Sequence, residues 1–123
     1  MSTYRDLDIY KESKKLAIEV HSMSMCLPKF ELYEQGSQIR RSSKAIASAI
    51  VEGYGRRRYR ADFVKYLIYA QAECDETILH LEFLFDTKSL LNEELFNGLR
   101  SQYVTLSKRI NNFTKWTERN HPY

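Results

Sequence analysis

Apolar and small residues recur along the chain at the spacing of a helix that is buried on one side. Between residues 39 and 53 they are Ile39, Ser43, Ile46, Ile50 and Gly53, separated by steps of 4, 3, 4 and 3 residues. Alternating steps of three and four residues place side chains on one stripe of an α-helix. The pattern therefore predicts a helix over about 37–52 with one buried side.

Three further segments show the same period, and no alternating strand pattern competes with it. They are about 8–26, 60–86 and 92–118. The longest stripe runs from Phe63 to Phe85, and a helix of that segment would be roughly 40 Å long at 1.5 Å per residue. Asp6 or Asp8 is expected to cap the first helix, and Pro28 to end it.

Four long helices with short connections predict an all-α fold, an antiparallel up-down-up-down four-helix bundle. The 123 residues suffice for one domain with its own core, so 1–123 is read as a single domain. Nine tyrosines and six phenylalanines offer more apolar surface than one small bundle can hide. A closed homo-oligomer is therefore expected.

The positive charge of the chain is concentrated in one stretch. Residues 37–60 carry seven Lys or Arg and one acid, a net charge of +6, whereas residues 61–98 carry a net charge of −6. The chain is predicted to turn on Gly53 and Gly55, just before an arginine triplet. The candidate binding residues of this basic stretch are Arg40, Arg41, Lys44, Arg56, Arg57, Arg58 and Arg60.

Two functions would explain this stretch. Cations at a helix N-terminus oppose the helix dipole, so stability alone would favour acids before the helix at 60–86. Guanidinium groups, free backbone amides and the neighbouring aromatic rings of Tyr54 and Tyr59 instead suit the phosphates and bases of RNA or DNA. Alternatively, the arginines form salt bridges across subunits with acids such as Glu52, Glu73 and Glu76.

No pattern of catalytic, metal-binding or phosphate-loop residues occurs in the sequence. The three histidines lack the Glu-x-x-His spacing of metal-binding bundles, and GYGRRR is not a phosphate loop. We expect no enzyme activity, no metal and no cofactor. Cys26 and Cys74 both follow a helical apolar pattern and are predicted to be buried free thiols. No apolar run could span a membrane, and the cytoplasm is the expected compartment.

The segment QIRRSSKAIASAIVEGYGRR resembles the 23S rRNA intervening-sequence protein family, also called the four helix bundle protein family, whose pattern is QxRRAxxSIxxNIAEGxGR. Residues that match this pattern include Gln38, Arg40, Arg41, Ile46, Ile50, Glu52, Gly53, Gly55 and Arg56. Weaker similarity extends over residues 5 to about 85. One departure is Ala49, which stands where the family has an asparagine.

The resemblance implies a bundle that assembles as a ring-like homopentamer. The family is also similar to the accessory protein of diversity-generating retroelements, a basic pentamer that binds nucleic acid and a reverse transcriptase. By analogy, the expected partners are RNA or DNA and a nucleic-acid-processing protein. No interaction with a membrane is expected.

Overall fold

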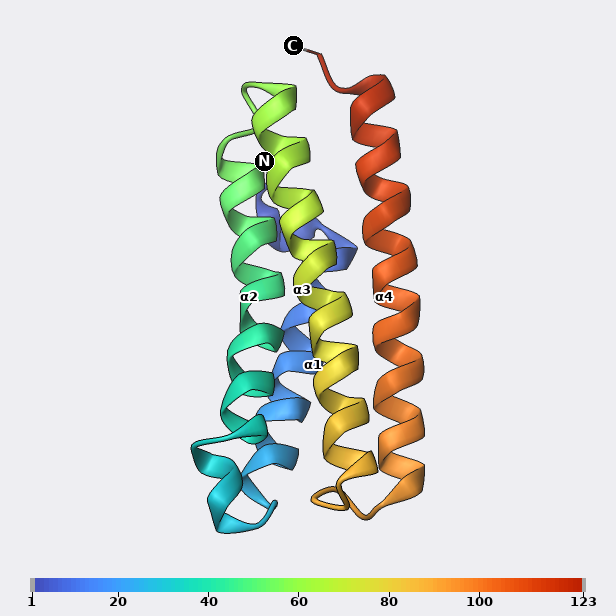
Figure 1. The fold of residues 1–123 in the computed structure, drawn as a ribbon. Coiled ribbons are helices and arrows are strands. Elements are labelled where there is room, and N and C mark those ends of the chain that lie inside the picture. The colour runs from blue at the N-terminus through green and yellow to red at the C-terminus, as the bar shows by residue number, and fades with distance from the viewer. Residues whose placement is uncertain (1, 123) are drawn as a thin grey trace.

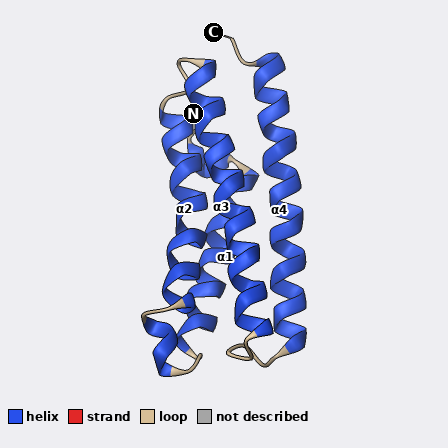
Figure 2. Ribbon diagram, in the orientation of Figure 1, coloured by secondary structure: helices blue, strands red, loops and turns tan. Residues whose placement is uncertain are grey.

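The computed structural model describes residues 2–122, which fold into four long helices with two short 3-10 helices. The long helices are α1 (Asp8–Met25), α2 (Gln35–Gly55), α3 (Arg60–Asp86) and α4 (Glu93–Asn120), and the short ones are η1 (Tyr4–Asp6) and η2 (Lys29–Leu32). Successive helices run in opposite directions (Figure 1), and residues 2–122 contain no strand (Figure 2). The predicted all-α antiparallel bundle is confirmed.

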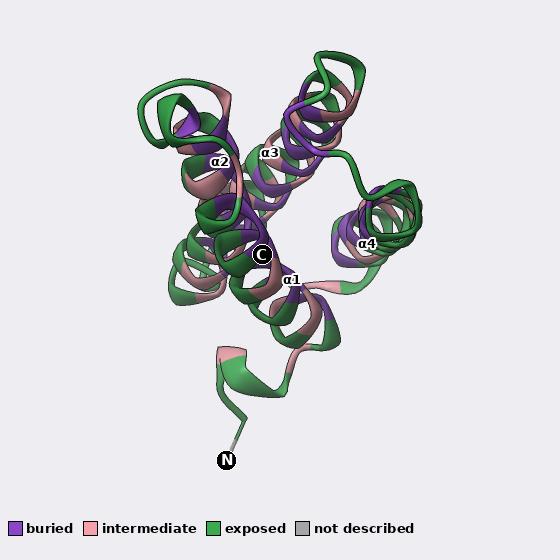
Figure 3. Cartoon of the chain, turned by 90° about the horizontal axis from the view of Figure 1, so that it is seen from below, coloured by how far each residue is buried: buried purple, intermediate pink, exposed green. Residues whose placement is uncertain are grey.

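Each helix packs against its neighbours in the chain, and α1 also contacts α4. The buried sides of the helices face the middle of the bundle (Figure 3). The core contains the residues of the predicted stripes, among them Ile46, Leu67, Leu81, Leu106 and Ile110, which are fully buried. The helical period thus correctly located the side of each helix that faces the core.

The end of α2 differs from the prediction, because the helix continues through both glycines to Gly55. Neither glycine makes the turn, because both lie inside α2 and neither has a positive φ. Gly53 is buried where α2 crosses α3, and a Cβ there would lie 3.0 Å from the Cβ of Tyr66. Glycine at this position permits close helix packing, and the turn itself is made by residues 56–59.

Two other local predictions were wrong. Neither aspartate caps α1, whose N-cap residue is Leu7; Asp6 instead accepts a hydrogen bond from the amide of Thr3 in a capping box of η1. Cys26 is exposed because it lies just past the last turn of α1, where the helical period no longer applies. Cys74 is buried as predicted, and burial raises the pKa of its thiol to about 12.

A buried carboxylate connects the two loops at one end of the bundle. Glu31 of η2 is 2% exposed, and its two oxygens accept hydrogen bonds from the amide of Gly36 at 3.2 Å and the hydroxyl of Ser89 at 2.6 Å. Gly36 belongs to the first turn of α2, and Ser89 lies between α3 and α4. Glu31 therefore holds the α1–α2 connection against the α3–α4 connection.

Gly36→Ala is expected to lower the free energy of unfolding by about 1 to 3 kcal/mol, because it overpacks this junction. A Cβ at Gly36 would lie 2.3 Å from the backbone oxygen of Glu31, so the loop would have to move. Gly98→Ala in α4 is the matched control, since nothing lies within 4 Å of its added Cβ. Alanine is the better helix former by about 1 kcal/mol, so the control should be stabilised. Urea unfolding of both variants measures the difference, and equal midpoints would contradict this account.

Candidate nucleic-acid interface

The arginine triplet lies at the end of the bundle where α2 meets α3, beside the C-terminal end of α4 (Figure 1). Arg56, Arg57, Arg58 and Tyr59 form the turn between α2 and α3, and Arg60 is the first residue of α3. All five side chains are exposed. We refer to residues 56–60 as the basic turn.

The guanidinium groups of the triplet are spread over aromatic rings rather than buried in ion pairs. Arg57 lies 4.0 Å from the centre of the Tyr54 ring and donates to the carbonyl of Tyr54 at 2.9 Å. Arg58 lies 5.6 Å from the ring of Tyr59. Such contacts hold a guanidinium in place while leaving its charge available to an anion.

Arg56 is the member of the triplet with a carboxylate partner. Its Nε donates to Glu52 at 3.2 Å, one helical turn earlier, and its guanidinium also lies 5.2 Å from the ring of Tyr66. The hydrogen bond to Glu52, followed by the proximity of Tyr66, raises the pKa of Arg56. The pair is solvent-exposed, so it contributes little to stability and leaves Arg56 accessible.

Arg60 explains why a cation is tolerated at the start of α3. Its guanidinium donates to the carbonyl oxygens of Glu118 and His121, at 3.3 and 3.2 Å, and so caps the C-terminal end of α4. A cation is favourable there because the C-terminal end of a helix dipole is negative. The ring of His121 in turn hydrogen-bonds to the carbonyl of Arg57 and packs edge-on against Phe63. The basic turn is thus fixed to α4.

A second aromatic and basic group, which the sequence analysis missed, follows along α3. Tyr66 and Tyr69 pack edge to face with their ring centres 5.4 Å apart, and the amine of Lys65 lies within 5.9 Å of both. Lys65 and Tyr69 are exposed, and Arg56 reaches this group through Tyr66. Lys65, Tyr66 and Tyr69 follow Asp62 at helical spacing in the first turns of the predicted helix. This position, directly after the arginines in the chain, could have identified them from the sequence.

The other predicted binding residues lie elsewhere on α2. Arg41 precedes Arg56 by 15 residues, or about 22 Å along a helix. Arg40 donates to the Ser24 hydroxyl at 3.1 Å and the Leu32 carbonyl at 2.7 Å, which ties α2 to the end of α1 and to η2. Lys44 lies against α1. The structure therefore groups Arg56, Arg57, Arg58 and Arg60, but not the whole predicted set.

Arg41 lies close to Glu73 of its own chain. The amide oxygen of Gln38 accepts a hydrogen bond from Arg41 at 3.0 Å. Burial, and then repulsion from Glu76, raise the pKa of Glu73, and the positive charge of Arg41 opposes part of this rise. Burial lowers the pKa of the neighbouring His80, whose ring contacts the Gln35 side chain.

The residues matched to the family pattern have distinct structural roles. Gln38 orients Arg41, Glu52 pairs with Arg56, and Gly53 permits close packing of α2 on α3. Gly55 is the last residue of α2, and a Cβ there would meet nothing within 4 Å. Ala49, in place of the asparagine, is half-buried and packs against the core.

Within residues 2–122 no group of His, Cys, Asp and Glu side chains could hold a metal ion. In the same part of the chain, no helix combines the length and the apolar character needed to cross a lipid bilayer.

The chain is similar to a known protein family and to solved structures. The model of the family described as 23S rRNA-intervening sequence protein matches residues 5–112 of this chain. A crystal structure from Bacteroides thetaiotaomicron, described as a protein with unknown function from the S23 ribosomal protein family, superimposes with a TM-score of 0.78 at 23% identity, covering 87% of this chain and 95% of that chain. At that identity the superposition shows a common fold. No curated protein matches the chain. Since the family model spans most of its length, this chain belongs to the 23S rRNA-intervening sequence protein family.

Proposed function

We propose that the protein is a non-enzymatic, self-associating bundle of the cytoplasm that binds RNA or DNA through the basic turn. The observation that carries the proposal is that Arg57 and Arg58 have no carboxylate partner within the described part of the chain. The salt bridges of residues 2–122 are Arg56–Glu52, Arg100–Glu82 and Arg109–Glu12. Adjacent unneutralised guanidinium groups repel each other and are favoured where a phosphate backbone can neutralise them.

The aromatic rings of the same surface support nucleic acid over a simple anion. Tyr59 and Tyr69 are exposed and lie beside Arg58 and Lys65. Rings beside cations can stack on bases while the cations contact phosphates. The alternative, in which the arginines of the basic turn form salt bridges across subunits, has less support, because Glu52 already pairs with Arg56 of its own chain.

Binding of a fluorescently labelled RNA single strand should weaken steeply with salt. If one basic turn makes about four phosphate contacts, the log–log slope should be roughly −2.8, a loss of about 50-fold in affinity between about 50 and 200 mM salt. Fluorescence anisotropy over this range gives the slope. A slope near zero, or no binding at the lowest salt, would contradict the proposed function.

A further inference from the structure

One face of α3 points away from the core yet carries large apolar side chains. Ile68, Leu79 and Phe83 are 53%, 46% and 47% exposed, and the exposed Ala72 lies between them. Their spacing of 4, 7 and 4 residues puts the four side chains in one row, opposite the buried stripe of the same helix. We call this row, Ile68, Ala72, Leu79 and Phe83, the α3 outer stripe.

Acidic residues accompany the α3 outer stripe. Asp75, Glu76 and Asp86 are exposed on the same side of α3. Scattered single apolar residues on a surface need no explanation, but a row of them bordered by charges is typical of an interaction site. The surface that covers this row should therefore be apolar in its middle and basic at its edges.

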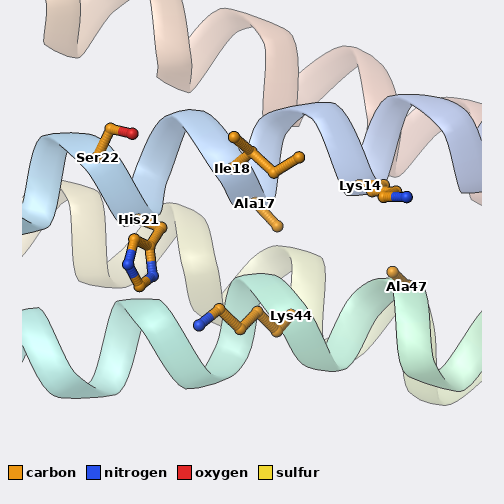
Figure 4. A pocket seen from close by; sticks show the side chains of 7 residues that line it. All are labelled: Lys14, Ala17, Ile18, His21, Ser22, Lys44 and Ala47. Atoms are coloured by element: carbon orange, nitrogen blue, oxygen red, sulfur yellow. The ribbon is translucent and has the colours of Figure 1, made fainter.

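Such a surface exists on a different side of the same molecule. A groove of about 330 Å³ lies between α1 and α2 and is lined by Ala17, Ile18 and Ala47, together with Ser22 and the basic side chains of Lys14, His21 and Lys44. Figure 4 shows Ala17 and Ile18 on α1 between His21 and Lys14, with Lys44 and Ala47 on the facing side of α2. We call this the α1–α2 groove, and none of its seven lining residues is acidic.

We propose that the α3 outer stripe of one copy packs into the α1–α2 groove of a second copy. The small side chains of Ala17 and Ala47 leave room for Leu79 and Phe83, and Lys14 and Lys44 then meet the acids that border the stripe. Removing apolar surface from water drives the contact, and the charges set its register. This inference rests on the proposed self-association and names the surfaces that produce it.

Two different surfaces make this contact heterologous. Each copy presents one stripe and one groove, so every copy can bind two neighbours, and the series either closes into a ring or grows as an open chain. Lys44, counted among the nucleic-acid residues by the sequence analysis, belongs to the subunit contact in this arrangement. The basic turn lies at the end of the bundle, away from the middle of α2, and stays free for phosphates.

Two complementary variants test the pairing. Leu79→Glu with Phe83→Glu disables the stripe, and Ile18→Glu with Lys44→Glu disables the groove. All four side chains are exposed, so the bundle should keep its helical content. By sedimentation velocity each variant alone should be a monomer, whereas an equimolar mixture should form a dimer and nothing larger, because one intact stripe and one intact groove remain.

The controls separate the possible failures. Leu91→Glu changes a side chain that is 77% exposed and belongs to neither surface, so it should leave the wild-type assembly unchanged. A wild type that is monomeric at every concentration would overturn self-association itself. A wild-type oligomer that persists in the stripe variant, or variants that stay monomeric when mixed, would overturn this pairing alone. Lys14→Glu with Lys44→Glu, which touches no core residue, should weaken association, and unchanged association would also overturn the pairing.

Discussion

Replacing Arg56, Arg57 and Arg58 by alanine is expected to weaken binding of single-stranded RNA by roughly one to two orders of magnitude at physiological salt. Each lost phosphate contact should reduce the magnitude of the log–log salt slope by about 0.7. The loss of three contacts should therefore lower that magnitude by roughly 2. The three side chains are exposed, and none of them belongs to the hydrophobic core. Helical content and assembly should therefore stay as in the wild type.

Two matched variants show whether binding depends on the total positive charge or on the position of the charge in the basic turn. Lys29→Ala with Lys88→Asn and Lys108→Ala removes the same charge from exposed positions outside the basic turn, and asparagine suits the positive φ of Lys88. This control should bind almost normally. Arg56→Lys with Arg57→Lys and Arg58→Lys keeps the charge and should retain most of the slope. Equal affinity and slope in the alanine variant and the wild type would exclude the basic turn as the binding surface.

Glu31→Ala is expected to cost about 2 to 4 kcal/mol of unfolding free energy, a large effect for one side chain. The substitution leaves the amide of Gly36 and the hydroxyl of Ser89 without their acceptor in a buried position, and it also leaves a cavity. A buried donor without a partner costs about 1 to 3 kcal/mol. The α1–α2 and α3–α4 connections should both become less stable, because Glu31 no longer links them.

A double-mutant cycle isolates the link between the loops. Ser89→Ala alone should cost about 1 kcal/mol, and in the Glu31→Ala background it should cost less because its partner is gone. Urea unfolding supplies the four free energies. If the two substitutions were simply additive, Glu31 would act on α2 alone and would not join the two connections.

The sequence by itself determined the helices and their buried sides. Its apolar period depends on contacts between residues three and four positions apart, and this local rule located α1, α3 and α4 to within two residues at each end. The same rule identified core residues such as Ile46, Leu67 and Ile110. The concentration of positive charge in residues 37–60 identified the arginine triplet, which the structure keeps together with Arg60 at one end of the bundle.

Only the tertiary structure decided what the polar residues and glycines do, because their partners lie far away in the chain. Gly53 resembles a turn residue until Tyr66 of α3 is packed against it. Arg60 resembles a misplaced cation at the start of α3 until the end of α4 lies beside it, 58 residues later in the chain. Arg40 resembles a binding residue until Ser24 and Leu32 accept its hydrogen bonds. Helical periodicity reports which side of a helix is buried, whereas these roles depend on which other helix supplies the neighbour.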